Sequence, residues 1–88
     1  MSVKDEIGVD FEADDVVIEV SPKKKQDGTF EWTYRFHRVY DFRGQQKEAY
    51  FFRREHDELV GRALVHAIHW MNENDATQWV RNQRARAA

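Results

Sequence analysis

The sequence predicts an α+β domain in which a three-stranded antiparallel sheet (β-β-β-α) packs on a long C-terminal helix. Residues 30–42 alternate between aromatic and polar side chains, which is the two-residue period of a half-buried strand. Shorter β-like runs at 16–20 and 47–54 lie on either side of it, each separated from it by a turn that contains glycine. Residues 57–74 then place apolar side chains three and four positions apart, which is the spacing of an amphipathic helix.

We interpret residues 1–14 as an acidic N-terminal arm and residues 15–88 as a single domain. Ile7, Val9 and Phe11 alternate with polar residues over too short a stretch to distinguish a flexible arm from an edge strand. A chain of 88 residues supports one hydrophobic core and leaves no room for a second domain.

The first predicted strand is Val16–Val20, in which every residue except Glu19 is β-branched. Pro22 lacks an amide hydrogen and is expected to end this strand. Asp27-Gly28 suits the positive φ angles of a tight hairpin that leads into the second strand. One face of that second strand carries nearly all of its rings, which are Phe30, Trp32, Tyr34, Phe36, Tyr40 and Phe42. We expect this face to point toward the helix, since the opposite face is mostly polar.

The third predicted strand covers residues 47–54. Its centre is a run of consecutive apolar residues, so alternation does not identify the face that points inward. The inward side chains are either Tyr50 and Phe52 or Ala49 and Phe51.

The helix is predicted to begin at Asp57, whose carboxylate can accept hydrogen bonds from the free amides of a first turn. Its sheet-facing stripe consists of Val60, Ala63, Leu64, Ala67, Ile68 and Met71. The apolar pattern stops at residues 72–75, where we predict a bend, and Asp75 resembles the first residue of a capping box. Trp79 and Val80 are then expected to fold back on the sheet, with the arginines beyond them in solvent.

Composition argues against several classes of function. The chain has no cysteine, which removes disulfides, thiolate metal sites and cysteine nucleophiles. The four glycines are too scattered to cradle a phosphate, and neither serine lies in a nucleophile motif. His66 and His69 lie one helical turn apart, but a zinc site needs further ligands at fixed geometry. We therefore expect a protein that is not an enzyme and that uses no cofactor, metal or small-molecule substrate.

The distribution of charge is uneven along the chain, although the net charge is only −2. Residues 1–20 hold one lysine against seven acidic residues, and residues 21–56 hold nine basic residues against five acidic ones. The two segments either neutralise each other within the molecule or face different partners. The acidic start does not resemble a signal peptide, and no stretch approaches the roughly 18–20 apolar residues of a membrane span. We expect a cytoplasmic protein with no membrane partner.

The main functional expectation is a small binding protein of the adaptor or inhibitor type, such as a phage or another mobile element encodes. A strand over residues 29–42 spans ~45 Å, whereas a helix over residues 57–74 spans ~27 Å, so the helix cannot cover every ring. Uncovered rings favour contact with another protein or with a second copy of this chain. The candidate protein-binding residues are Trp32, Tyr34, Tyr40, Phe42 and Trp79.

The alternative is a nucleic-acid-binding module that uses a basic sheet face and the C-terminal arginines. Its candidate residues are Lys23, Lys24, Lys25, Arg35, Arg38, Arg43, Arg53 and Arg54, joined by Arg81, Arg84 and Arg86. The layout of three strands and a helix resembles the arm-binding N-terminal domains of phage-type integrases. That resemblance is one of topology without a diagnostic motif, and it implies that the sheet would read DNA. A sequence pI near 6.1 weighs against this alternative.

Overall fold

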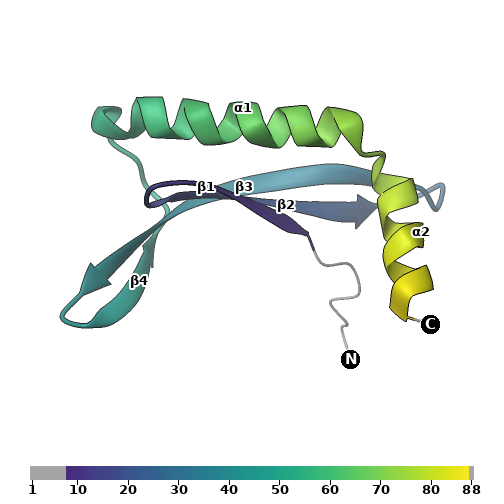
Figure 1. Cartoon of the computed structure of the whole chain (residues 1–88), viewed down its shortest axis with the longest axis horizontal. Helices are drawn as coiled ribbons and strands as arrows, with labels where there is room; N and C mark the ends of the chain where they lie inside the picture. The colour runs from purple at the N-terminus through teal and green to yellow at the C-terminus, as the bar shows by residue number, and fades with distance from the viewer. Residues whose placement is uncertain (1–7, 88) are drawn as a thin grey trace.

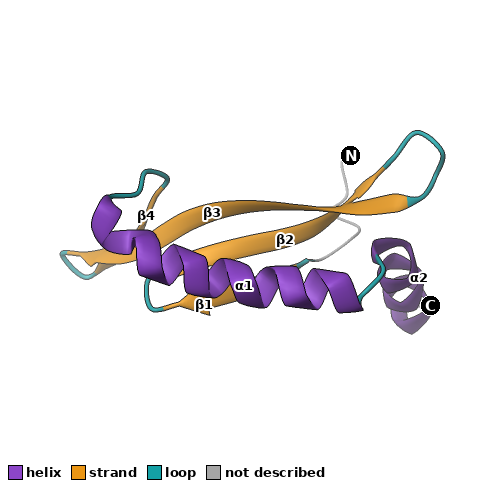
Figure 2. Ribbon diagram, turned by 90° about the horizontal axis from the view of Figure 1, so that it is seen from above, coloured by secondary structure: helices purple, strands orange, loops and turns teal. Residues whose placement is uncertain are grey.

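The computed structural model describes residues 8–87, which form a four-stranded antiparallel sheet and two helices (Figures 1 and 2). The strands follow one another in space in the order of the sequence. Helix α1 lies along one face of the sheet, and helix α2 turns away from it and crosses one end of the sheet (Figure 1). The elements are β1 (Val9–Ala13), β2 (Val16–Lys24), β3 (Phe30–Phe42), β4 (Gln45–Ala49), the 3-10 turn η1 (Arg54–His56), α1 (Asp57–Glu73) and α2 (Ala76–Ala87). The α+β class and the antiparallel sheet are confirmed.

The predicted number of strands is wrong, because part of the acidic segment forms a fourth strand. β1 pairs with β2 from Val9 opposite Val20 to Ala13 opposite Val16. Of the two interpretations of this segment, the edge strand is therefore correct for Val9–Ala13. The segment has three apolar side chains on its inner face, Val9, Phe11 and Ala13, a run too short for alternation alone to identify a strand. The rest of the predicted arm, residues 1–7, lies outside the described residues.

β2 does not end at Pro22 as predicted but continues to Lys24, with Pro22 opposite Trp32. The amide of Lys25 donates a hydrogen bond to the carbonyl of Thr29 at 2.7 Å. Because hydrogen-bonded positions alternate along an antiparallel strand, Pro22 directs its nitrogen away from β3. The Pro22 nitrogen points instead toward the β1 side of β2, where the pairing with β1 ends at Val20. The missing amide hydrogen therefore breaks no pairing to β3.

β3 has the bounds predicted for the second strand, whereas β4 is shorter than the predicted third strand and starts earlier. The two are joined at Arg43 and Gly44, whose φ angles of +52° and +81° are typical of a tight hairpin turn. Since β4 ends at Ala49, alternation stops there and neither predicted pair of inward residues is correct. Ala49 is buried and Phe52 packs on the core. Their neighbours Tyr50 and Phe51 are exposed.

The core lies between α1 and the first two strands. Val16, Ile18 and Val20 are almost fully buried beneath Ala63 and Ala67, whose small side chains allow the helix to approach the sheet closely. Partly buried rings surround this centre, namely Phe11, Trp32, Phe36, Phe52 and Trp70. Ile68, which we predicted in the sheet-facing stripe, is instead exposed. The contact is centred on the two alanines, and Ile68 lies at its margin.

The predicted bend near residues 72–75 is confirmed as a break between two helices. Asp75 Oδ2 accepts a hydrogen bond from the amide of Gln78 at 2.9 Å, so Asp75 caps the start of α2. Val80 is fully buried and α2 contacts β3, as expected of a helix that folds back on the sheet. Neither α1 nor α2 combines the length and hydrophobicity that crossing a membrane requires.

Candidate interaction surfaces

Three aromatic rings, Trp32, Trp70 and Trp79, connect both helices to β3, and we call them the tryptophan cluster. Their ring centroids are 4.9 to 6.1 Å apart. The indole nitrogen of Trp32 also donates a hydrogen bond to the backbone carbonyl of Asn74, between the helices, at 2.6 Å. Two of the five predicted protein-binding residues, Trp32 and Trp79, therefore contribute to internal packing.

The helix covers only part of the ring-bearing face. α1 lies mainly over β1 and β2, so the far end of β3 and the β4 strand extend beyond it (Figure 2). The other three predicted protein-binding residues, Tyr34, Tyr40 and Phe42, are exposed on this face. Uncovered rings are present as expected, but they follow from the position of α1 over β1 and β2 and not from its length alone, since Tyr34 in the middle of β3 is exposed.

Three exposed rings lie along the β3–β4 hairpin: Phe42 at its tip, Tyr40 further back on β3, and Phe51 beside Arg38 at the base of the hairpin. Tyr40, Phe42 and Phe51 are 42%, 50% and 60% exposed. The guanidinium of Arg38 lies over the Phe51 ring at 5.2 Å from its centroid, and that of Arg43 lies over the Phe42 ring at 5.1 Å. We call these five residues the hairpin surface. Tyr40 and Phe51 line an open hollow there together with Arg38 and Ala49.

Arg38 is the best-anchored residue of the hairpin surface, because its side chain is only 13% exposed. It lies 3.7 Å from the carboxylate of Asp15 and donates a hydrogen bond to the Phe51 carbonyl at 3.3 Å. These contacts hold the exposed Phe51, which lies outside any strand, in a defined position. The sequence indicated Tyr40 and Phe42 but missed Phe51, since a predicted strand over residues 47–54 left its direction open.

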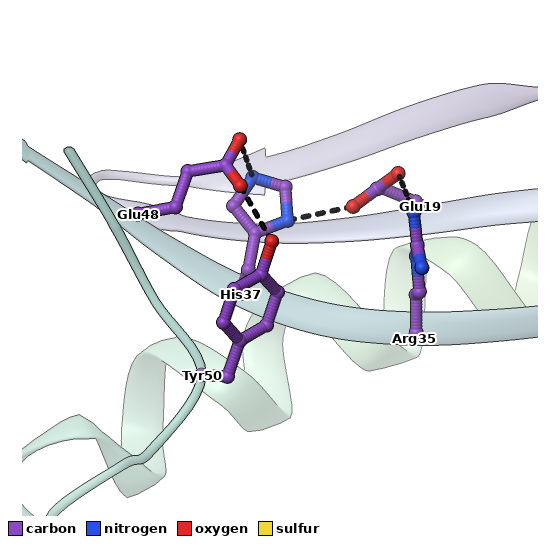
Figure 3. Close-up of polar contacts among 5 residues, drawn as sticks. All are labelled: Glu19, Arg35, His37, Glu48 and Tyr50. Carbon is purple, nitrogen blue, oxygen red and sulfur yellow. Dashed lines mark hydrogen bonds and ion pairs between the residues drawn. The ribbon is translucent and has the colours of Figure 1, made fainter. Parts of the chain in front are cut away.

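The opposite face of the sheet carries a polar cluster around His37 (Figure 3). The His37 side chain is only 8% exposed, and its Nδ1 atom lies 2.8 Å from a carboxylate oxygen of Glu19. This contact is close in distance but lacks hydrogen-bond geometry. The Nε2 atom lies 3.9 Å from Glu48, which also accepts a hydrogen bond from the Tyr50 hydroxyl at 2.5 Å. That hydrogen bond to a carboxylate raises the pKa of Tyr50.

This open sheet face is acidic, not basic. Residues directly opposite each other in an antiparallel sheet share a face, so the register assigns the charges. Within the described strands the acidic side chains on this face are Asp10, Glu12, Glu19, Glu31, Asp41 and Glu48. The basic ones on the same strands are Lys23 and Arg35. Arg35 lies 3.4 Å from Glu19, which offsets its charge locally.

The residues predicted to bind nucleic acid do not form one strip. Lys23, Lys24 and Lys25 lie at the β2–β3 turn, at one end of β3, whereas Arg43 lies at its other end. Arg35 and Arg38 occupy opposite faces of β3. Arg53 and Arg54 precede α1, and Arg54 Nε donates a hydrogen bond to Asp57 at 2.6 Å, which raises the pKa of Arg54. The alternation of residues 30–42 already implies that Arg35 and Arg38 face opposite ways, whereas the separation of the other basic residues depends on how the elements are arranged in space.

The histidines do not converge on one point. His66 and His69 line a hollow between α1 and β1 with Phe11 and Trp70, and His69 lies 3.3 Å from Glu73. His56 accepts a hydrogen bond from the amide of Arg53 at 3.1 Å. Among residues 8–87, no group of three or more His, Asp or Glu side chains is arranged to hold a metal ion.

Two surfaces of this fold are therefore chemically distinct: the hairpin surface, rich in rings and arginine, and the acidic open face. A third feature, at the opposite end of β3, is the concentration of lysines at the β2–β3 turn. Comparison of the chain with protein-family models, with curated proteins and with solved structures finds no match.

Proposed function

We propose that this protein is a non-catalytic binding protein, of the adaptor or inhibitor type, that docks another protein on the hairpin surface. The observation that supports the proposal is the exposure of Tyr40, Phe42 and Phe51 together at one end of the molecule. Each aromatic side chain buries ~150–250 Å² when it is covered, so three neighbouring rings leave a large apolar area in contact with water. Soluble monomers seldom expose contiguous apolar patches of several hundred Å² unless these have a function.

The composition of the hairpin surface suits a protein interface. Aromatic and arginine side chains are enriched among the few residues that contribute most of the binding energy in such interfaces. Arg38 is held by Asp15 and by the Phe51 carbonyl, so little side-chain entropy remains to be lost when a partner binds. The surface is therefore partly organised before contact.

The local charge favours a protein over nucleic acid as the ligand at this end. Arg38 is paired with Asp15, and the charges of Arg43 and Lys47 are balanced within the hairpin by Asp41 and Glu48, which lie on its open face. Binding to nucleic acid depends on an excess of positive charge that neutralises phosphates. The hairpin lacks such an excess, whereas its apolar area is large.

A site-specific crosslinking experiment tests the proposal. The photoreactive residue benzoylphenylalanine replaces Phe42 in the full chain, and it replaces Val65 in a matched control that carries an exposed apolar residue on α1. We expect the probe at position 42 to crosslink a protein in nuclease-treated native extract, and the probe at position 65 to yield much less. A crosslink to a second copy would identify the partner as the chain itself.

Specificity is tested by adding Tyr40→Ser and Phe51→Ser to the probe at position 42. Both rings are exposed, so the double change should leave the melting temperature nearly unchanged while removing the crosslink. Equal crosslinking at positions 42 and 65, or a crosslink that survives both changes, would contradict the proposal.

A further inference from the structure

The end of the molecule opposite the hairpin surface is strongly basic. It is formed by the β2–β3 turn and by α2, which lie beside the same end of β3 (Figures 1 and 2). Its basic residues are Lys23, Lys24, Lys25, Arg81, Arg84 and Arg86. Residues 76–87 contain no acidic residue. We call these six side chains the basic end.

Contacts between the turn and α2 hold the two halves of the basic end together. The amide of Phe30 donates a hydrogen bond to Thr77 Oγ1 at 2.9 Å. The guanidinium of Arg84 lies over the Phe30 ring at 5.5 Å from its centroid, and Lys24 is the residue directly opposite Phe30 on β2. Residues 24 and 84, far apart in sequence, are therefore both neighbours of Phe30.

Two acidic residues accompany these cations within residues 23–31, and neither removes the excess of positive charge. Asp27 accepts hydrogen bonds from the hydroxyl and the amide of Thr29. The hydroxyl bond is the main reason why the pKa of Asp27 is lowered, so this carboxylate is ionised at neutral pH. Glu31 lies opposite Lys23 on the open face. Six cations against these two carboxylates and that of Asp75, which caps α2, leave the basic end positive, although the whole chain has a net charge of −2.

The outward face of α2 is polar and lacks an apolar anchor. Ala76 and Val80 are buried, and the helical period places Gln78, Arg81 and Asn82 on the exposed side. Gln78 Nε2 donates a hydrogen bond to Asn82 Oδ1 at 3.0 Å. The large apolar side chains that are exposed in residues 8–87 all lie between residues 34 and 68, outside the basic end.

We propose that the basic end binds the phosphate backbone of duplex DNA. Positive charge combined with amide side chains, and without exposed apolar residues, suits a polyanion better than a protein surface, which would offer an apolar core. A single strand is the weaker candidate because its bases stack on exposed rings. At this end Phe30 is covered by Arg84, and Trp79 packs in the tryptophan cluster. This inference is independent of the proposed protein contact, which lies at the far end of β3.

Salt dependence is the first test, measured by fluorescence anisotropy with the full chain and a labelled 20-base-pair DNA duplex. About four phosphate contacts would give a slope of about −3.6 in the logarithm of the binding constant against the logarithm of salt concentration. Affinity should then fall by about 100-fold between 50 and 200 mM salt. Binding that is insensitive to salt over this range overturns the inference.

Matched substitutions are the second test. Lys24→Gln with Lys25→Gln removes two charges at the turn, and Arg81→Gln removes one from α2. Each lost contact should reduce the magnitude of the salt slope by about 0.9. The controls are Arg62→Gln on α1 and Arg54→Gln before α1. Each removes one positive charge outside the basic end and should leave the salt slope unchanged. Equal losses in the controls would mean that net charge, not this surface, governs binding, and would overturn the inference.

Competitors distinguish the class of polyanion. Unlabelled duplex DNA should displace the probe, whereas poly-glutamate at an equal concentration of negative charge should compete at least 10-fold less well. Equal competition by poly-glutamate would assign the basic end to an acidic protein and overturn the inference. Tighter binding of a single strand of the same length would also overturn it.

Discussion

Trp32 on β3 donates its indole hydrogen to the backbone carbonyl of Asn74, 2.6 Å away, at the break between the two helices. The Asn74 side chain in turn donates to the carbonyl of Trp70 at 2.9 Å, near the end of α1. These two bonds fix the point at which the chain turns from α1 into α2. The Trp32 indole therefore helps to set the position of α2, together with the buried Val80 and the hydrogen bond between Phe30 and Thr77.

Replacing Trp32 with phenylalanine should destabilise the fold by about 1–3 kcal/mol, because it leaves the Asn74 carbonyl without its donor and removes ring area from the tryptophan cluster. Urea unfolding followed by circular dichroism measures the change. Tyr34→Phe is the matched control: its ring is exposed on the same strand, and the change should alter stability by less than about 0.5 kcal/mol. Equal effects of the two substitutions would show that the bond to Asn74 is unimportant.

Two glycine-to-alanine substitutions should have opposite signs. A Cβ atom at Gly8 would collide with the backbone carbonyl of Val20, so Gly8→Ala should displace β1 and cost about 1–3 kcal/mol. A Cβ atom at Gly61 meets open space on the helix α1, so Gly61→Ala should stabilise by about 0.5–1 kcal/mol. Thermal unfolding of both variants checks the pair. A stabilising Gly8→Ala would contradict the close approach of β1 to β2.

The strongest sequence signals predicted the parts of the fold in which local pattern and packing agree. The alternation of β3 fixed both its bounds and its inner face, because Phe30 to Phe42 repeat with one period over a whole strand. The loss of apolar pattern near Asn74 likewise predicted the break between the helices. Both features depend on the side chains of one continuous segment.

The features that sequence reasoning missed depend on contacts between distant segments. β1 has little pattern of its own and is defined by its pairing with β2. The prediction that Pro22 ends its strand is wrong, because β2 stays paired with β3 as far as Lys24. Only the pairing with β1 stops before Pro22, at Val20. The basic residues were expected to form one sheet face, whereas Arg38 lies on the face opposite Arg35 and is paired with Asp15. Of the three rings on the hairpin surface, the sequence predicted Tyr40 and Phe42 but not Phe51. Phe51 was placed inside the predicted strand 47–54, whereas β4 ends at Ala49.

The pairing of His37 with Glu19 should contribute to stability. Glu19→Gln removes the carboxylate that lies 2.8 Å from the buried Nδ1 atom and 3.4 Å from Arg35. We expect a loss of up to about 1 kcal/mol, because the substitution removes the attraction of the carboxylate for the buried imidazole and for the largely exposed Arg35. A double-mutant cycle with His37→Gln isolates the coupling between the two side chains. Glu12→Gln, on the same face of β1, is the control, and an equal loss there would attribute the effect to general charge.

Tyr50 should titrate at a higher pH than an ordinary tyrosine, because its hydroxyl donates to the Glu48 carboxylate and deprotonation would place two negative charges together. A pKa raised in the folded state means that this hydrogen bond contributes stability below the ordinary tyrosine pKa of about 10, and that the contribution is lost as pH rises through the higher folded value. Tyrosinate absorbance at 295 nm follows the titration, and Tyr50→Phe identifies the late component. Glu48→Gln should shift that component to lower pH, whereas Glu31→Gln, elsewhere on the open face, should not; a late component that persists in Glu48→Gln would assign the shift to another cause.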